Sequence, residues 1–367
     1  MRSWRAWWQS RLVEVGVICG VLGAACGPGQ AQTNPVNLTL KGRWPASPPG
    51  YAWGAAVAGP YALVTEYSGA VRVLEISDPT HPRLVGGLSV GNAAYGVGIA
   101  GSHAYVGNGT TNLVILDLSS PTNPVVTAVA SLGTNVATMD LSVVDQRLFV
   151  MGAAGVAVYD LSNPTNPQPV TRWGGLGGLD AQGQHWGPYA LGIAGHYAYV
   201  AEAGAGLEVL DIAEVSNPRS TGRYQAPGRY YYGVAVAGSY AYLARTGFGL
   251  DIVDISDPAH PVRTAQVSMT DPAGQVTAAD GYLYVTDETL EIYQISELPA
   301  LARPTVAGQN LTLFWNDAAQ GMRLQQASSL GASAWHDVTV AGPTNHLSLP
   351  LTNGAAWFRL IQGGAQD

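Results

Sequence analysis

The chain has 367 residues, of which 47% are hydrophobic and only 11% are charged, and 46 are glycine. This composition excludes a disordered chain, which needs high charge and few apolar side chains, and it excludes coiled coils and helical solenoids, in which so much glycine would be costly. The formal net charge of −8 argues against a nucleic-acid-binding protein, which would carry a basic surface.

The N-terminal segment has the features of a secretory signal peptide. Arg2, Arg5 and Arg11 precede an apolar run from Val13 to Ala25, and small residues follow, as in signal peptides. The run is shorter than the about 20 residues that a transmembrane helix needs. We predict that residues 1–31 are a signal peptide and that the mature protein is secreted, periplasmic or attached to the bacterial cell surface.

Both cysteines, Cys19 and Cys26, lie inside this segment. Cleavage after Ala31 would leave a chain with no thiol, and so no disulfide and no cysteine-ligated metal. The run Gly23–Cys26 resembles a lipoprotein box, so Cys26 is a candidate for lipidation. A lipid on Cys26 is the only membrane attachment that the sequence suggests. The sequence leaves both alternatives open, cleavage after Ala31 and lipidation at Cys26.

Residues 36–299 contain six copies of one unit. Each copy begins with a run of mostly small residues such as Gly233–Gly238, continues with an aromatic run such as Tyr240–Leu243, and ends with a third run such as Leu250–Asp254. β-Branched and aromatic runs bounded by Gly and Pro favour strands, and a repeat of 40–45 residues is typical of a propeller blade. Small residues in the first run fit an innermost strand, which has little space near the axis.

A proline turn and a fourth strand follow the third run in the first five units. The turns are Asp78-Pro79, Ser120-Pro121, Asn163-Pro164, Asn217-Pro218 and Asp257-Pro258. The sixth unit lacks a fourth strand, but Asn37–Gly42 at the other end of the repeats could supply it. We therefore predict an all-β fold, a six-bladed β-propeller closed by an N-terminal outer strand, because closure leaves only short protected edges.

The third runs identify a family resemblance. Leu113–Asp117 has the sequence LVILD and Leu250–Pro258 has LDIVDISDP, which resemble the LVIVD repeats of secreted or surface proteins of bacteria and archaea. The resemblance covers residues 37–298 and is weakest in the third and sixth units, where the leading glycine is lost. It implies a propeller outside the cytoplasm, but no settled biochemical activity.

The period stops after Pro304, and a different pattern follows. Residues 304–362 contain five short apolar runs: Leu311–Trp315, Arg323–Gln326, Trp335–Val340, Leu347–Leu349 and Trp357–Ile361. We predict a small β-sandwich there, similar to C-terminal modules of secreted environmental bacterial proteins. It serves either as a structural appendage or in sorting and surface attachment.

The blade topology predicts one candidate site. The start of the first strand and the end of the second strand lie on the same face of an up-and-down blade, so residues at these points converge on one mouth of the channel. The starts are aromatic: Tyr51, Trp53, Tyr95, Trp186, Tyr189, Tyr230, Tyr231 and Tyr232. The ends are polar: Glu66, Asn108, Glu202, Arg245 and Asp287, and the longest insertion adds His185.

Aromatic residues with a few convergent polar groups are typical of a ligand site, although the same aromatics could simply pack adjacent blades together. The favoured hypothesis is a non-catalytic recognition module for a carbohydrate, peptide or protein. The alternative is a polysaccharide hydrolase or lyase that uses Glu66, Glu202 and Asp287 as acid and base and Arg245 to hold a carboxylate.

We predict no cofactor and no metal. Residues 96–101 match G-x-G-x-x-G, but a dinucleotide site needs a helix after this motif, and here a hairpin is expected. His81 and His260 occupy turn positions where other units have Asn123 and Asn166, which favours a role in turn formation.

Overall fold

The structure is a computed structural model. In the repeated part it describes residues 36–45, 51–91, 93–133, 138–152, 155–174, 176, 187–202, 205–226, 229–245, 249–269 and 273–297. In the C-terminal part it describes residues 305–307, 310–314, 322–327, 336–338, 346–350 and 357–362. The predicted signal peptide and Cys26 lie outside the described residues.

Three four-stranded blades come first. Blade 1 comprises β2 (Ala52–Ala58), β3 (Tyr61–Glu66), β4 (Ala70–Glu75) and β5 (Arg83–Ser89). Blade 2 comprises β6 (Val97–Ala100), β7 (His103–Gly107), β8 (Asn112–Asp117) and β9 (Val125–Ser131). Blade 3 comprises β10 (Thr138–Val144), β11 (Arg147–Gly152), β12 (Gly155–Asp160) and β13 (Gln168–Trp173).

The remaining blades follow the same plan. Blade 4 comprises β14 (Pro188–Ala194), β15 (Tyr197–Glu202), β16 (Gly206–Asp211) and β17 (Arg219–Tyr224). Blade 5 comprises β18 (Tyr231–Ala237), β19 (Tyr240–Arg245), β20 (Gly249–Asp254) and β21 (Val262–Ser268). Blade 6 comprises β22 (Gln275–Ala279), β23 (Tyr282–Thr286), β24 (Thr289–Glu297) and β1 (Val36–Pro45).

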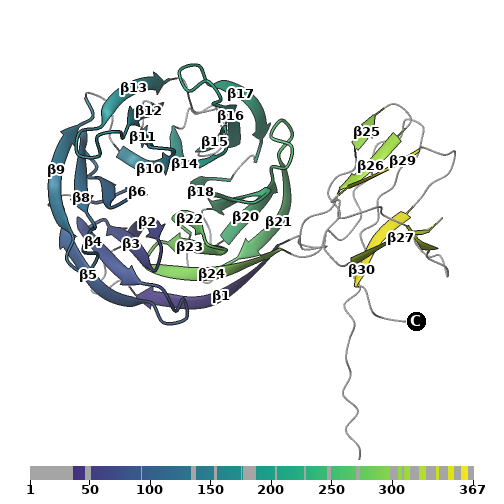
Figure 1. The fold of residues 1–367 in the computed structure, drawn as a ribbon, viewed down its shortest axis with the longest axis horizontal. Coiled ribbons are helices and arrows are strands. Elements are labelled where there is room, and N and C mark those ends of the chain that lie inside the picture. Colours follow the sequence, from purple (N-terminus) through teal and green to yellow (C-terminus); the bar gives the residue numbers. More distant parts are fainter. Residues whose placement is uncertain are drawn as a thin grey trace, which may run out of the picture. The chain divides into compact units, whose positions relative to one another are not determined.

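The blades form a closed ring around a central axis (Figure 1). β2 lies beside β6 and β22, and the other innermost strands follow one another in blade order. Blade 6 has the strand order β1-β24-β23-β22, so the N-terminal strand supplies its outer edge. The predicted all-β, six-bladed propeller with an N-terminal outer strand is confirmed.

Packing at the axis explains why the first strands are rich in small residues. A Cβ atom added to Gly96, just before β6, would lie 2.6 Å from the Asp140 Cα of β10. Neighbouring innermost strands therefore approach so closely that only glycine fits there. Farther out, larger apolar residues fill the space between blades, as where Leu63 and Val73 of blade 1 form one core with Val106 and Leu116 of blade 2.

The C-terminal part contains two three-stranded sheets within the described residues, with the strand orders β25-β26-β29 and β28-β27-β30. The strands are β25 (Thr305–Ala307), β26 (Asn310–Phe314), β27 (Met322–Ala327), β28 (His336–Asp337), β29 (His346–Pro350) and β30 (Trp357–Gln362). They overlap all five predicted runs, and the packing of the two sheets as a sandwich stays a prediction. In the part of the chain that the structure describes, no helix is long and apolar enough to cross a membrane.

Candidate ligand-binding site

The innermost strands enclose a cavity of about 250 Å³ along the propeller axis. Its wall consists mainly of Gly, Ala, Val and Ile side chains from all six blades. Among the described lining residues, Asp140 is the one with an ionisable side chain. The lining side chains are therefore mostly small and apolar, and Asp140, Ser142, Gln275 and Thr277 are the polar ones among the described lining residues.

Asp140 and Gln275 interrupt the small-residue pattern and link neighbouring blades. Asp140 accepts hydrogen bonds from the backbone N–H groups of Leu141 (2.8 Å) and of Leu191 in blade 4 (2.9 Å). Burial raises the pKa of the Asp140 carboxyl to about 6, although the two backbone donors act in the opposite direction. Gln275 of blade 6 donates from Nε2 to the Tyr232 carbonyl of blade 5 (2.6 Å). The sequence analysis missed both residues, although each stands where other blades have Gly or Ala.

We call the end of the channel where first strands begin and second strands end the mouth. In blades 1, 4 and 5, a register shift near the start of the first strand leaves one residue without a partner on the second strand. These residues are Trp53, Tyr189 and Tyr232, three of the predicted aromatics. Such a β-bulge redirects a side chain relative to the regular alternation, so the aromatics lie at irregular positions rather than in the regular strand.

Trp53, Tyr67 and Tyr95 form an aromatic cluster where blade 1 meets blade 2. The Trp53 and Tyr95 rings meet nearly edge to face, with centroids 5.0 Å apart, and Tyr67 meets Tyr95 in the same way at 5.8 Å. Tyr67 is 55% exposed, as is nearby Tyr51, whose carbonyl accepts the Tyr67 N–H. Burial and a hydrogen bond with Tyr67 raise the pKa of the Tyr95 hydroxyl. The cluster thus both packs two blades together and presents aromatic surface, and Tyr67 was not among the predicted residues.

A second aromatic contact joins blades 4 and 5 at the mouth. Tyr189 and Tyr232 form a tyrosine pair with ring centroids 5.1 Å apart and an interplanar angle of 67°. Tyr232 is 38% exposed, and Tyr230 is partly buried. Tyr231, between them in sequence, is fully buried and belongs to the core between these blades. Its side chain therefore does not contribute to the exposed surface.

Two of the three carboxylates predicted at the ends of second strands, Glu66 and Glu202, are buried and paired with arginine. Glu66 is 2% exposed and contacts Arg72 Nε at 2.9 Å, whereas Glu202 is fully buried and accepts from Arg223 Nη1 at 2.9 Å. Arg223 also pairs with Glu208 at 3.1 Å. Glu66 and Glu202 lie in blades 1 and 4, which are opposite each other in the ring (Figure 1). The structure thus places them in separate ion pairs and does not bring them together.

The other predicted polar residues have local roles or lie outside the described residues. Asn108 is 7% exposed, and its side-chain oxygen accepts from the Thr110 hydroxyl at 2.6 Å in the turn after β7. The Asp287 N–H donates to the Thr289 carbonyl at 3.1 Å. His185 and Trp186 lie outside the described residues.

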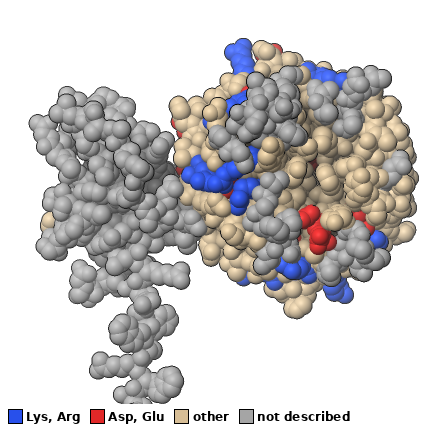
Figure 2. Space-filling model, turned by 180° about the vertical axis from the view of Figure 1, so that it is seen from behind, with Lys and Arg blue, Asp and Glu red and all other residues tan. Residues whose placement is uncertain are grey.

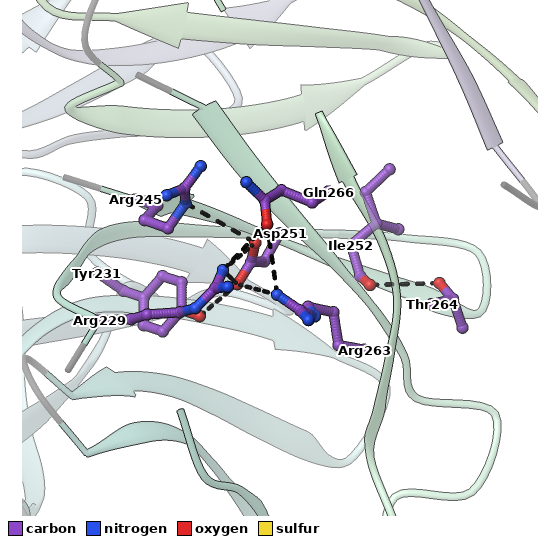
Figure 3. A network of polar contacts seen from close by, with 8 residues as sticks. All are labelled: Arg229, Tyr231, Arg245, Asp251, Ile252, Arg263, Thr264 and Gln266. Atoms are coloured by element: carbon purple, nitrogen blue, oxygen red, sulfur yellow. Dashed lines mark hydrogen bonds and ion pairs between the residues drawn. The ribbon is translucent and has the colours of Figure 1, made fainter. Parts of the chain in front are cut away.

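Arg245, at the position equivalent to Glu66 and Glu202, takes part in a network centred on Asp251 of β20 (Figure 3). Asp251 is fully buried and accepts from Tyr231 Oη at 2.5 Å and from Arg229 Nη1 at 2.8 and 2.9 Å. Arg245 Nε and Arg263 Nη1 each lie 3.8 Å from its carboxylate. Burial, together with the hydrogen bond to Asp251, raises the pKa of Tyr231 far above its ordinary value. The sequence analysis found Arg245 and Tyr231 but missed Arg229, Asp251 and Arg263.

The two histidines on the opposite face take part in turns. His81 Nδ1 lies 3.1 Å from Asp78 Oδ2, and His260 Nδ1 lies 2.8 Å from Asp257 Oδ2. Hydrogen bonds, the strongest from the Thr80 hydroxyl and the next from His81, lower the pKa of Asp78 to about 2. In the described part of the chain, no three His, Cys, Asp or Glu side chains lie close enough together to hold a metal ion.

Comparisons with known proteins support the fold. The LVIVD repeat model matches residues 49–89, 91–129, 190–226 and 228–268, which correspond to blades 1, 2, 4 and 5. A search of curated proteins found no match. The β-propeller domain of Cps50 (Swd1) from Myceliophteria thermophila is a similar solved structure, with a TM-score of 0.51 and 7% sequence identity, and the alignment covers 71% of this chain and 100% of that one. At this identity the likeness concerns the fold alone. The chain therefore carries LVIVD repeats in blades 1, 2, 4 and 5 of a six-bladed β-propeller.

Proposed function

We propose that the propeller is a non-catalytic recognition domain that acts outside the cytoplasm and binds a carbohydrate, peptide or protein at its mouth. The observation that carries this proposal is the aromatic surface at two blade junctions, with Tyr51 and Tyr67 each 55% exposed and Tyr232 38% exposed. Aromatic rings with a polar tip suit ligands that are apolar on one side and polar on the other.

A buried donor in the aromatic cluster supports the same site. Trp53 Nε1 is buried and has no hydrogen-bond acceptor among the described residues, whereas buried indole N–H groups usually have one. The cluster therefore combines exposed aromatic rings with a buried indole N–H that has no hydrogen-bond acceptor among the described residues.

The carboxylates do not favour the enzymatic alternative. A glycosidase needs two carboxyl groups within about 10 Å of each other, whereas Glu66 and Glu202 are in opposite blades and each pairs with its own arginine. Their acceptor capacity is used by Arg72, Ser68 and Arg223. Recognition without catalysis is therefore the function that we propose.

Binding measurements on the purified full chain would test this proposal. A glycan array and a peptide library would identify a ligand, and titration would give its Kd for the original chain and for Trp53→Ala and Tyr232→Ala. We expect each substitution to weaken binding about tenfold or more, since aromatic anchors dominate many interfaces.

Val129→Ala is the matched control, because Val129 is 60% exposed on the outer strand β9, away from the mouth. Its affinity should equal that of the original chain. Unchanged affinity in both aromatic variants, with intact thermal unfolding, would contradict recognition at the mouth.

A further inference from the structure

The network in blade 5 contains more positive charge than its buried carboxylate requires. Three arginines, Arg229, Arg245 and Arg263, surround Asp251, although the whole chain has only 17 Lys and Arg residues. We call these three residues the arginine cluster. With one carboxylate among them, the group carries a net charge of about +2 at neutral pH, because arginine stays protonated.

Blade 4 shows that the blade fold does not require an excess of arginines over carboxylates. At the positions of Arg245, Asp251 and Gln266, blade 4 has Glu202, Glu208 and Arg223, which follows from the matching strand registers. There a single arginine pairs with two carboxylates. In blade 1, one arginine pairs with one carboxylate. At these three positions blade 5 has one cation and one carboxylate, and Arg229 and Arg263 add two further cations beside Asp251.

Asp251 does not satisfy all three arginines. Its carboxylate oxygens accept from Tyr231 and Arg229 at hydrogen-bond distance, whereas the nearest atoms of Arg245 and Arg263 stay at 3.8 Å, which is beyond a hydrogen bond. The buried Nε of Arg245 has no hydrogen-bond partner among the described residues. Arg263 has a 3.4 Å contact with Gln266 Oε1. Guanidinium donors of Arg245 and Arg263 therefore remain available.

The three arginine side chains are partly exposed, although the Arg245 Nε atom itself is buried. The side chains of Arg245, Arg229 and Arg263 are 17%, 28% and 36% exposed, and they approach Asp251 from different sides (Figure 3). Arg245 lies at the mouth end of β19, where its Nη2 would be 3.2 Å from a Cβ on Gly249, so glycine leaves room for the guanidinium. On the face drawn in Figure 2, most of the described propeller surface is uncharged, and Lys and Arg side chains gather at a few places.

We propose that the arginine cluster binds the carboxylate of a uronic-acid sugar, with the neighbouring tyrosine pair contacting the sugar ring. Arginine presents paired N–H groups that match the two oxygens of a carboxylate. Tyr189 and Tyr232 lie at the mouth end of blades 4 and 5, the arginine cluster belongs to blade 5, and Tyr232 follows Tyr231, whose hydroxyl binds Asp251. A binding site that combines tyrosine rings with arginines for a carboxylate favours an acidic saccharide over an acidic peptide. This inference rests on the proposed recognition at the mouth and names its ligand class.

Calorimetric titration of the full chain with tetragalacturonate would test the inference. The comparison ligands are the neutral galactotetraose and the peptide tetraglutamate, at about 50 and 300 mM salt, since screening weakens exposed ionic contacts. We expect tetragalacturonate to bind at least about tenfold more tightly than galactotetraose at low salt and to lose that advantage at high salt. Arg245→Gln and Arg263→Gln should each weaken its binding about tenfold, because charge-assisted hydrogen bonds are lost.

Arg83→Gln is the charge-matched control. Arg83 is 70% exposed at the start of β5 and pairs with Glu75, so its loss should leave the affinity unchanged. Asp251 keeps Arg229 and Tyr231 in both cluster variants, and thermal unfolding would verify that they fold. If the Arg245→Gln variant is unstable, titration of the Arg263→Gln variant tests the cluster instead, because Arg263 is the more exposed of the two arginines.

The outcomes separate this inference from the proposed function. No binding of tetragalacturonate at about 10 mM, equal affinity for the acidic and neutral sugars, or binding of tetraglutamate alone would overturn the inference. If Tyr232→Ala weakens binding of both sugars and the two arginine variants bind tetragalacturonate as tightly as the original chain, recognition at the mouth stands without the anion site. If only the arginine variants lose tetragalacturonate, the anion site stands and the aromatic surface is not the recognition element.

Discussion

The hairpins between first and second strands place residues in left-handed backbone conformations, at a cost that depends on residue type. Gly59, Gly101, Gly195 and Gly238 have φ between 54° and 58°, which glycine adopts freely. In blade 3 the corresponding turn contains Asp145 (φ 49°) and Gln146 (φ 58°). Asp tolerates this region because its short side chain can hydrogen-bond locally, whereas an ordinary residue costs about 1–2 kcal/mol there. These four glycines occupy the position of Asp145, whereas at the position of Gln146 blade 6 has Gly281 (φ 79°), so blade 3 carries strain at Gln146 that glycine avoids in blade 6.

Replacing Gln146 by glycine should stabilise the protein. We expect Gln146→Gly to raise the free energy of unfolding by about 1 kcal/mol, less than the full strain because glycine gains freedom in the unfolded chain. Gly195→Ala should lower it by a similar amount, and since a Cβ there meets nothing within 4 Å, the effect would be purely conformational. Urea denaturation measures both, and a Gln146→Gly variant no more stable than the original chain would contradict the strain argument.

At the scale of strands, polar side chains tie neighbouring blades together where the apolar pattern is interrupted. The Thr286 hydroxyl donates to the Trp53 carbonyl at 2.7 Å across the closure between blades 6 and 1, and the Thr65 hydroxyl donates to the Tyr95 carbonyl between blades 1 and 2. Asp140 links β10 to β14 in the same way, but through a carboxylate. The blade junctions thus differ in chemistry, and one of them contains a carboxyl group whose pKa is raised by burial.

Asp140 should make stability fall as the pH rises from about 4 to 6. Folding raises the pKa of its carboxyl from 3.8 to about 6, so in this range the folded state holds a proton that the unfolded state has released. The loss amounts to at most about 3 kcal/mol, and less to the extent that solvent in the channel screens the charge. The stability of Asp140→Asn relative to the original chain should therefore increase between about pH 4 and pH 7.

Chemical denaturation at several pH values would measure this difference. Asp78→Asn is a suitable comparison, because hydrogen bonds lower the pKa of Asp78 to about 2 and its contribution is lost only as the pH falls below about 4. Its difference from the original chain should be constant from about pH 5 to 7. A difference for Asp140→Asn that is equally constant would show that this carboxyl does not titrate in that range.

At the scale of the whole molecule, ring closure depends on β1. This strand pairs with β24, and its Trp44 is 9% exposed within a core that also contains Val64 of blade 1 and Ile292 of blade 6. Arg43 forms an ion pair with Glu291, which in turn accepts from the Tyr293 hydroxyl at 2.6 Å. One strand therefore completes the outer edge of blade 6 and contributes to the junction with blade 1.

Removing β1 should open the ring. We expect a chain that begins at residue 46 to lose more than about 3 kcal/mol of unfolding free energy, because the Trp44 side chain and the partner of β24 are both lost, and to aggregate through the exposed edge. A chain that begins at residue 32 retains β1 and is the control. Thermal unfolding and gel filtration measure the change, and a synthetic peptide of residues 36–45 should restore stability in part. Equal stability of the two chains would refute closure by β1.

The sequence by itself determined the strands, the six repeats and their closure, because turn residues and apolar patterning act over a few neighbouring positions. It also located the mouth, since the alternation of strand direction follows from the repeat. Tertiary structure alone decided which of three consecutive tyrosines is buried, because a bulge exposes Tyr232 while Tyr231 packs between blades. It likewise decided that Glu66 and Glu202 pair with arginines and that Arg245 joins Arg229 and Arg263 around Asp251. These contacts join residues on different strands and in different turns, whose approach depends on strand register and not on local sequence.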